Sequence, residues 1–265
     1  MNSKEVDLYY FTGTGNTYLA AKKIAQTLSE SGCSVRLLDI AKANPLEINF
    51  TKTLGFGFPV ACWNTYPFVR RFFNRLPQAF GTEAFVFSTM GDSSLKAAAM
   101  IGNILKNKGY SVIATKGFKM PNNLIAVQTE EKNTVKRENA YLKIQNYAMD
   151  IFSGKSKAEN ANIFVKFCFA VSSIITGLWE TKPSQKIIRF KVGQKECTKC
   201  MMCVKICPVN NISFNVFPVF GGNNCQLCMR CISYCPPNAI KAFFVKSGKV
   251  YRALDHDEAD KCFNG

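Results

Sequence analysis

Residues 11–17 read FTGTGNT and follow a short, mostly apolar run at residues 6–11. That run predicts a buried parallel strand. Residues 17–32 follow with a helical apolar pattern that stops at Gly32, a natural end for a helix. A glycine-rich turn between a strand and a helix offers backbone N–H groups and a helix N-terminus to an anion. The stretch therefore predicts an anion-binding loop.

The composition of this loop separates three kinds of phosphate-binding loop. A Walker loop ends in G-K-[ST], whereas residues 15–17 are Gly-Asn-Thr, and a dinucleotide loop needs glycine where this chain has Tyr18. What remains is a hydroxyl-lined loop that binds a phosphate monoester without a cationic side chain. Its candidate donors are Thr12, Gly13, Thr14, Gly15, Asn16 and Thr17.

The rest of the first 150 residues alternates between strand and helix patterns. Further strands are expected at residues 34–40, 53–60, 83–90 and 110–118, and further helices at 66–77, 94–109 and 129–152. This alternation predicts an α/β fold with a doubly wound parallel sheet. Five strands suit the strand order 2-1-3-4-5.

The pattern T-x-T-G-N-T directly after the first strand resembles the FMN phosphate loop of flavodoxins, and the element order is flavodoxin-like. The resemblance implies that FMN is the ligand, with its phosphate on Thr12, Thr14, Gly15, Asn16 and Thr17. It also implies that loops after the third and fourth strands hold the isoalloxazine, which gives as candidates Pro59, Val60, Ala61, Trp63, Thr89, Met90, Gly91 and Asp92. Trp63 either stacks on the ring or packs between domains.

Two cysteine runs near the end of the chain share the spacing C-x₂-C-x₂-C-x₃-C-P. They are Cys197, Cys200, Cys203 and Cys207, followed by Cys225, Cys228, Cys231 and Cys235. A zinc site is satisfied by four ligands and does not require this spacing twice. The spacing resembles that of bacterial-type ferredoxins, which implies two 4Fe–4S clusters. The resemblance also implies that the fourth cysteine of each run serves the other cluster, so that Cys235 joins the first three cysteines of the first run and Cys207 those of the second.

The domain order resembles that of flavodoxin–ferredoxin fusion proteins of anaerobes. We expect a flavodoxin-like domain at 1–152, a helical connector at 153–190, a small α+β ferredoxin domain at 191–250 and a C-terminal tail at 251–265. Part of the connector, residues 161–179, is nearly apolar and about as long as a minimal membrane span. Because Lys166 lies within it, we expect no integral span. It is either a helix packed between domains or an interfacial helix in peripheral membrane contact.

Composition narrows the chemistry and the compartment. The chain has 12 cysteines and one histidine, and its start lacks a signal-peptide pattern, so we expect a cytoplasmic protein whose clustered cysteines bind metal. A single histidine leaves no H-E-x-x-H or Cys₂His₂ site, and cofactors should carry the chemistry. The formal charge of +16 comes from scattered basic residues. We therefore expect no nucleic-acid partner and an acidic redox protein instead.

The function expected from these features is electron transfer, with FMN and two 4Fe–4S clusters exchanging electrons with an external redox protein or an electron-donating or electron-accepting enzyme. The alternative is an FMN-dependent reductase of a small substrate, fed by its own clusters. A redox sensor that binds nucleic acid is a third class, for which no helix-turn-helix is evident. No side chain is assigned a catalytic role, and the sequence leaves the oligomeric state open.

Overall fold

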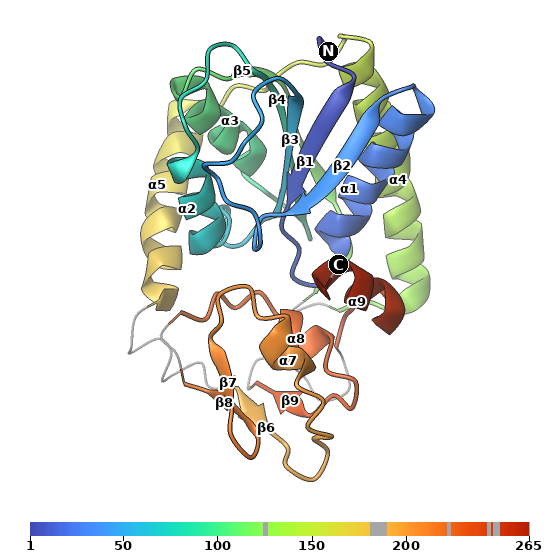
Figure 1. The fold of residues 1–265 in the computed structure, drawn as a ribbon, viewed down its shortest axis with the longest axis vertical. Helices are drawn as coiled ribbons and strands as arrows, with labels where there is room; N and C mark the ends of the chain where they lie inside the picture. Colours follow the sequence, from blue (N-terminus) through green and yellow to red (C-terminus); the bar gives the residue numbers. More distant parts are fainter. Residues whose placement is uncertain (124–126, 181–189, 222–223, 243–244, 246–249, 265) are drawn as a thin grey trace.

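The computed structural model describes residues 1–123, 127–180, 190–221, 224–242, 245 and 250–264. It has a larger α/β domain and a smaller lobe that carries both cysteine runs, and the two lie against each other (Figure 1).

The larger domain is built on a five-stranded parallel sheet with the order β2-β1-β3-β4-β5, which confirms the expected flavodoxin-like arrangement. Its strands are β1 (Glu5–Tyr10), β2 (Ser34–Asp39), β3 (Thr53–Pro59), β4 (Glu83–Met90) and β5 (Ser111–Lys119). Its helices are α1 (Asn16–Glu30), α2 (Pro67–Arg75), α3 (Ala97–Asn107) and α4 (Glu130–Phe152).

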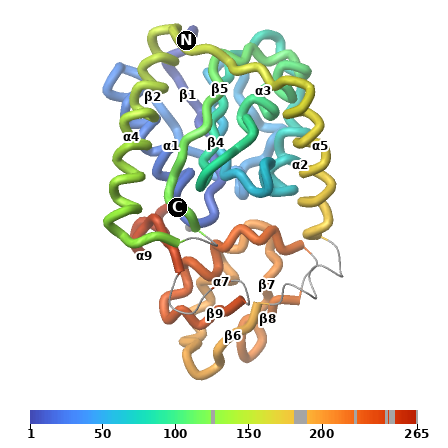
Figure 2. Tube along the Cα trace, turned by 180° about the vertical axis from the view of Figure 1, so that it is seen from behind, coloured from blue at the N-terminus to red at the C-terminus, as the bar shows by residue number. Residues whose placement is uncertain are grey.

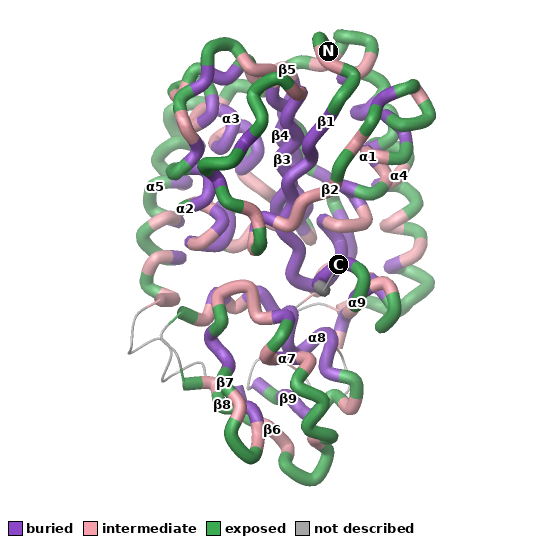
Figure 3. Tube along the Cα trace, viewed as in Figure 1, coloured by how far each residue is buried: buried purple, intermediate pink, exposed green. Residues whose placement is uncertain are grey.

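Both faces of the sheet are covered, and the apolar alternation of the strands fills two cores. On β1, Leu8 and Tyr10 pack with α1 and α4, whereas Tyr9 packs with α2 and α3 on the opposite face of the sheet. The central strands are therefore coloured as buried along most of their length (Figure 3). The loops at the carboxyl ends of the strands point toward the smaller lobe (Figure 1).

The connector forms α5 (Ile163–Gly177) and the short 3₁₀ turn η1 (Leu178–Glu180). Of the two positions expected for this helix, packing between the domains is wrong: α5 lies along the outside of α2 and α3. Seen from behind, it forms one edge of the larger domain, with α4 at the opposite edge (Figure 2). The other expected position is that of an interfacial helix in peripheral membrane contact.

The smaller lobe has the expected α+β character. Two antiparallel pairs, β6 with β9 and β7 with β8, flank two single-turn helices. The bounds are β6 (Lys191–Val192), α7 (Met202–Lys205), β7 (Ile212–Phe214), β8 (Pro218–Phe220), α8 (Arg230–Ser233) and β9 (Ile240–Lys241).

The residues expected as a C-terminal tail end in α9 (His256–Asn264). Leu254, Cys262 and Phe263 are buried and join the core on the α1 side of the sheet. The hydroxyl of Tyr10 lies 3.6 Å from the sulfur of Cys262. The end of the chain therefore folds back onto the larger domain, because its apolar residues recur at helical spacing.

Candidate functional site

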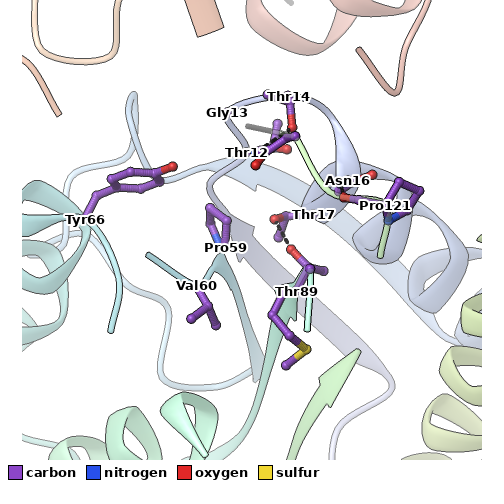
Figure 4. Close-up of a pocket in the computed structure, with 13 residues that line it drawn as sticks. Thr12, Gly13, Thr14, Asn16, Thr17, Pro59, Val60, Tyr66, Thr89 and Pro121 are labelled. Atoms are coloured by element: carbon purple, nitrogen blue, oxygen red, sulfur yellow. Dashed lines mark hydrogen bonds between the residues drawn. The ribbon is translucent and has the colours of Figure 1, made fainter. Parts of the chain in front are cut away.

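A cavity opens at the carboxyl ends of β1, β3 and β4, where ligands of this fold class bind (Figure 4). Its walls include most of the candidates from the sequence. The residues that line the cavity are Thr12, Gly13, Thr14, Asn16, Thr17, Pro59, Val60, Tyr66, Thr89, Met90, Gly91, Pro121 and Asn123.

The hydroxyls of Thr12 and Thr14 keep their protons for a ligand, and so does one hydroxyl of the Thr17–Thr89 pair. The hydroxyl of Thr12 accepts from the backbone N–H of Gly15 at 3.1 Å, and that of Thr14 accepts from the side chain of Asn123 at 3.2 Å. Thr17 and Thr89 point at each other across the cavity, with their hydroxyl oxygens 2.7 Å apart (Figure 4). A hydroxyl that accepts a hydrogen bond can still donate one, so this donor set fits a phosphate monoester.

The first turn of α1 adds backbone donors. Gly15 caps the helix in the left-handed conformation, at φ 101°, which glycine adopts without strain. The side chain of Asn16 is used for structure: it donates to the carbonyl of Pro121 at 2.9 Å and accepts from the hydroxyl of Tyr251 at 2.6 Å. These two bonds hold the side chain of Asn16, while its backbone N–H, at the helix N-terminus, is available to an anion.

The loop after β3 folds back in a tight turn. Ala61 and Asn64 pair across it, and the two residues between them, Cys62 and Trp63, both have left-handed backbone angles of φ 47° and 60°. Such turns normally hold glycine or asparagine, so this one is strained. The turn leaves Trp63 51% exposed and outside the walls of the cavity, and Ala61 also lies outside them.

An aromatic residue that the sequence did not single out occupies the cavity instead. Tyr66 precedes α2, is buried, and packs edge-on against Phe11 at 5.6 Å between ring centroids. Burial raises the pKa of Tyr66, and the nearby thiols of Cys228, Cys62 and Cys225 raise it further. Tyr66 thus stands between the cavity and the second cysteine run. The only feature of the sequence that could have singled out Tyr66 is its place directly before Pro67, which begins α2.

The loop after β4 contributes three of its four candidates. Thr89, Met90 and Gly91 line the cavity, whereas Asp92 lies outside it and pairs with Lys119 at 3.1 Å.

The structure gathers the second cysteine run with the last cysteine of the first. A small apolar cavity in the smaller lobe is lined by Cys207, Cys225, Cys228 and Cys231, together with residues that include Phe190, Ile212 and Phe220. Burial raises the pKa of Cys225 to about 12, and the thiols of Cys228 and Cys207 add to this.

Cys197 and Cys203 of the first run share one hydrophobic cluster with Cys235. Burial raises the pKa of Cys203 to about 11, and the thiols that raise it further are those of Cys235, Cys200 and Cys197. Among the described residues, no three side chains converge to hold a single metal ion. An iron–sulfur cluster needs no such convergence, because each thiolate ligates its own iron.

The two cysteine runs are structural repeats as well as sequence repeats. Left-handed residues recur at Lys199, Met201 and Asn210 and again, 28 positions later, at Leu227, Met229 and Asn238. The last thiol of each run also accepts a backbone N–H, from Asn211 to Cys207 and from Ala239 to Cys235, both at 3.2 Å. Non-glycine residues rarely adopt this conformation, so its repetition marks two equivalent loops.

The phosphate loop and the second cysteine loop touch directly. A Cβ on Gly13 would collide with the carbonyl oxygen of Cys228, so the two backbones pack with no side chain between them. The backbone N–H of Ala253 donates to the carbonyl of Thr14 at 2.8 Å, which brings the C-terminal segment to the same loop.

Arg230, inside the second cysteine run, connects the two lobes. It is 3% exposed and donates twice to the carbonyl of Thr12, at 2.7 and 3.1 Å. It also donates to the carbonyl of Ile206 and pairs with Asp39 at 3.4 Å. Its guanidinium lies over the rings of Phe11 and Phe263, at 4.8 and 4.2 Å from their centroids.

Comparison with known proteins gives one family match. Residues 190–213 match the 4Fe-4S binding domain family. No curated protein matches the chain. The chain thus joins a flavodoxin-like domain, defined by its own sheet order, to a 4Fe–4S binding domain.

Several solved structures are similar to the larger domain. A flavodoxin from the domain Archaea is 14% identical, over 55% of this chain and 99% of its own, with a TM-score of 0.37. Megasphaera elsdenii flavodoxin is 21% identical, over 52% and 98%, with a TM-score of 0.40. Rubredoxin oxygen:oxidoreductase from Desulfovibrio gigas is 16% identical, over 57% of this chain but 37% of its own, with a TM-score of 0.38.

The buried guanidinium at the lobe contact yields a stability prediction. Replacing Arg230 by Met leaves Asp39 and the carbonyl of Thr12 buried without this donor. We expect the free energy of unfolding to fall by about 3–5 kcal/mol, as for other broken buried pairs. Denaturant unfolding of the holoprotein under anaerobic conditions measures the loss.

A matched control exists at the same contact. Lys22 on α1 pairs with Glu258 on α9 at 3.0 Å, but both side chains are exposed. Lys22→Met should cost less than about 1 kcal/mol. Equal losses in the two variants would show that Arg230 has no special part in joining the lobes.

Proposed function

We propose that this protein transfers electrons between one FMN and two 4Fe–4S clusters within a single chain, and exchanges them with an external redox protein. One observation carries the proposal: the backbone of the phosphate loop at Gly13 packs on that of Cys228 in the second cysteine loop. A flavin anchored in this cavity would lie next to a cluster held by that loop. A fused pair of centres exchanges electrons without a diffusional encounter.

The residues present fit FMN. Thr12, Thr14 and Thr17 offer hydroxyl donors to the phosphate, and the first turn of α1 offers backbone N–H groups. Of the ring-binding candidates, Pro59, Val60, Thr89, Met90 and Gly91 line the cavity, and Tyr66 joins them.

Two clusters are proposed although the family match covers only the first cysteine run. The second run repeats the spacing, the left-handed residues and the sulfur hydrogen bond of the first. We assign Cys225, Cys228, Cys231 and Cys207 to the cluster next to the flavin and Cys197, Cys200, Cys203 and Cys235 to the distant one. The distant cluster is nearer to solvent, because Cys200 is exposed and Cys197 is partly exposed.

In this arrangement the cofactors supply the redox chemistry, FMN exchanging one or two electrons and each cluster one. The chain's own residues position them and exclude water. Phe11 and Tyr66 are buried in one hydrophobic cluster with Cys228, and Arg230 fixes the carbonyl of Thr12 that begins the phosphate loop.

The external partner we propose is an acidic redox protein of the cytoplasm. The net charge of +16 supports it, because complementary charge speeds the encounter of two redox proteins.

The flavin site is tested by removing two hydroxyls. Thr14→Val combined with Thr17→Val deletes two donors to a charged phosphate, each worth about 1.5–3 kcal/mol. We expect FMN affinity to fall by about 100-fold or more, with the iron content unchanged. Flavin titration of the deflavinated protein measures the affinity.

The control is Thr27→Val on the same helix, whose hydroxyl is buried and donates to the carbonyl of Lys23 away from the cavity. It should leave FMN affinity within about twofold of the unmodified protein. If the double variant also keeps its affinity, the loop is not the phosphate site.

The electron path is tested by two cysteine variants. Cys207→Ala should damage the cluster next to the flavin, and Cys235→Ala the distant cluster. In stopped-flow experiments with a one-electron reductant that enters through the clusters, flavin reduction should slow by about tenfold or more in Cys207→Ala, because the cluster next to the flavin is the last step before it. Iron content and the EPR spectrum identify which cluster changed.

Cys207→Ser and Cys235→Ser, which keep a ligand atom, replace the alanine variants if the smaller lobe unfolds. Loss of the distant cluster in a folded Cys207 variant would contradict the crossed assignment. Unchanged flavin reduction without the near cluster would contradict the proposed path.

A further inference from the structure

The helix α5 carries its most apolar side chains on the side away from the protein. Six large apolar residues are between 40% and 84% exposed: Ile163, Phe164, Phe167, Val171, Ile174 and Ile175. At about 100° per residue they fall within one arc of about 120°. By length and composition Ile163–Glu180 could cross a membrane, yet only 22% of it is buried in the protein. The exposed colouring along α5 follows this face (Figure 3).

The opposite face of α5 is buried, and two of its four buried residues are polar. Ser172 and Thr176 are buried there beside Val165 and Phe169. A surface helix of a soluble domain normally has the reverse arrangement, with its apolar stripe turned to the core.

Hydrogen bonds hold the helix in this orientation. The side chain of Asn64 donates to the hydroxyl of Ser173 at 2.8 Å, and Arg70 donates to the hydroxyl of Thr176 at 3.2 Å. At the end of η1, Glu180 accepts both guanidinium N–H groups of Arg71, at 2.7 and 2.9 Å. Rotating α5 to bury its apolar arc would break these bonds, so the arc stays outside.

The exposed charges near the start of α5 are mostly basic. Lys166 is exposed beside the apolar arc on the same helix, and Lys155, Lys157 and Glu159 are exposed on the segment that leads into α5. Within Ile163–Gly177 the only charged residue is Lys166. The whole chain carries 34 basic and 18 acidic residues.

We propose that the apolar arc of α5 binds the surface of an anionic lipid membrane, with the helix lying in the interface. Its aliphatic and phenylalanine side chains would enter the acyl boundary and the lysines would meet anionic headgroups. Of the residues enriched where proteins bind one another, the arc contains phenylalanine but no arginine, tyrosine, tryptophan or methionine. The exposed lysines also disfavour self-association of two identical faces.

Vesicle flotation tests this proposal with the intact holoprotein under anaerobic conditions. One set of vesicles is phosphatidylcholine and the other contains about one quarter phosphatidylglycerol. We expect the protein to float with the anionic vesicles at low salt and to be released at high salt. Phe167→Glu combined with Ile174→Glu should lower the partition coefficient by about tenfold or more.

The matched control is Phe80→Glu, because Phe80 is 101% exposed and lies outside α5. It should bind vesicles as the unmodified protein does, and all variants should keep their flavin and iron. Failure of the unmodified protein to bind, or undiminished binding of the double variant, overturns the proposal. So does retention on vesicles in high salt and alkaline carbonate, which indicates a span. A concentration-dependent dimer that the double variant abolishes, without vesicle binding, would assign the face to a second copy of this chain.

Discussion

The buried guanidinium of Arg230 is the interaction on which the arrangement of the two lobes depends. A charge removed from water must be paired. The larger domain supplies the carbonyl of Thr12 and the carboxylate of Asp39 as partners of the guanidinium. The smaller lobe supplies the carbonyl of Ile206. Because Thr12 begins the phosphate loop, the same side chain fixes that loop against the second cysteine loop. The relative position of the two sites therefore follows from one desolvated charge.

This contact gives the two repeats of the smaller lobe different environments. Arg230 occupies the position that Met202 holds in the first run, and the second run packs through Cys228 against Gly13 of the larger domain. The first run keeps an exposed cysteine at Cys200. One sequence motif, used twice, thus provides an inner site beside the hydroxyl-lined cavity and an outer site with an exposed cysteine.

Much of the fold could be predicted because it is encoded locally. The alternation of strand and helix patterns predicted the sheet order that the structure has. The hydroxyl-rich loop lies where it was expected, at the end of the first strand. The features that escaped prediction depend on residues far apart in the chain: Arg230 and Thr12 are separated by 218 positions. Trp63 was expected to stack on the ring or to pack between domains. The left-handed turn that sends it to the surface contains no glycine that would have signalled such a turn.

In the proposed arrangement, the phosphate loop lies against the cluster held by the second cysteine run. The ³¹P NMR linewidth of bound FMN tests it most directly, in the oxidised and the fully reduced holoprotein. A reduced 4Fe–4S cluster is paramagnetic and relaxes nearby nuclei, whereas a fully reduced flavin is diamagnetic. If the phosphate lies beside this cluster, we expect the flavin phosphate resonance to broaden strongly on full reduction. A resonance that stays as narrow as in the oxidised protein would contradict it.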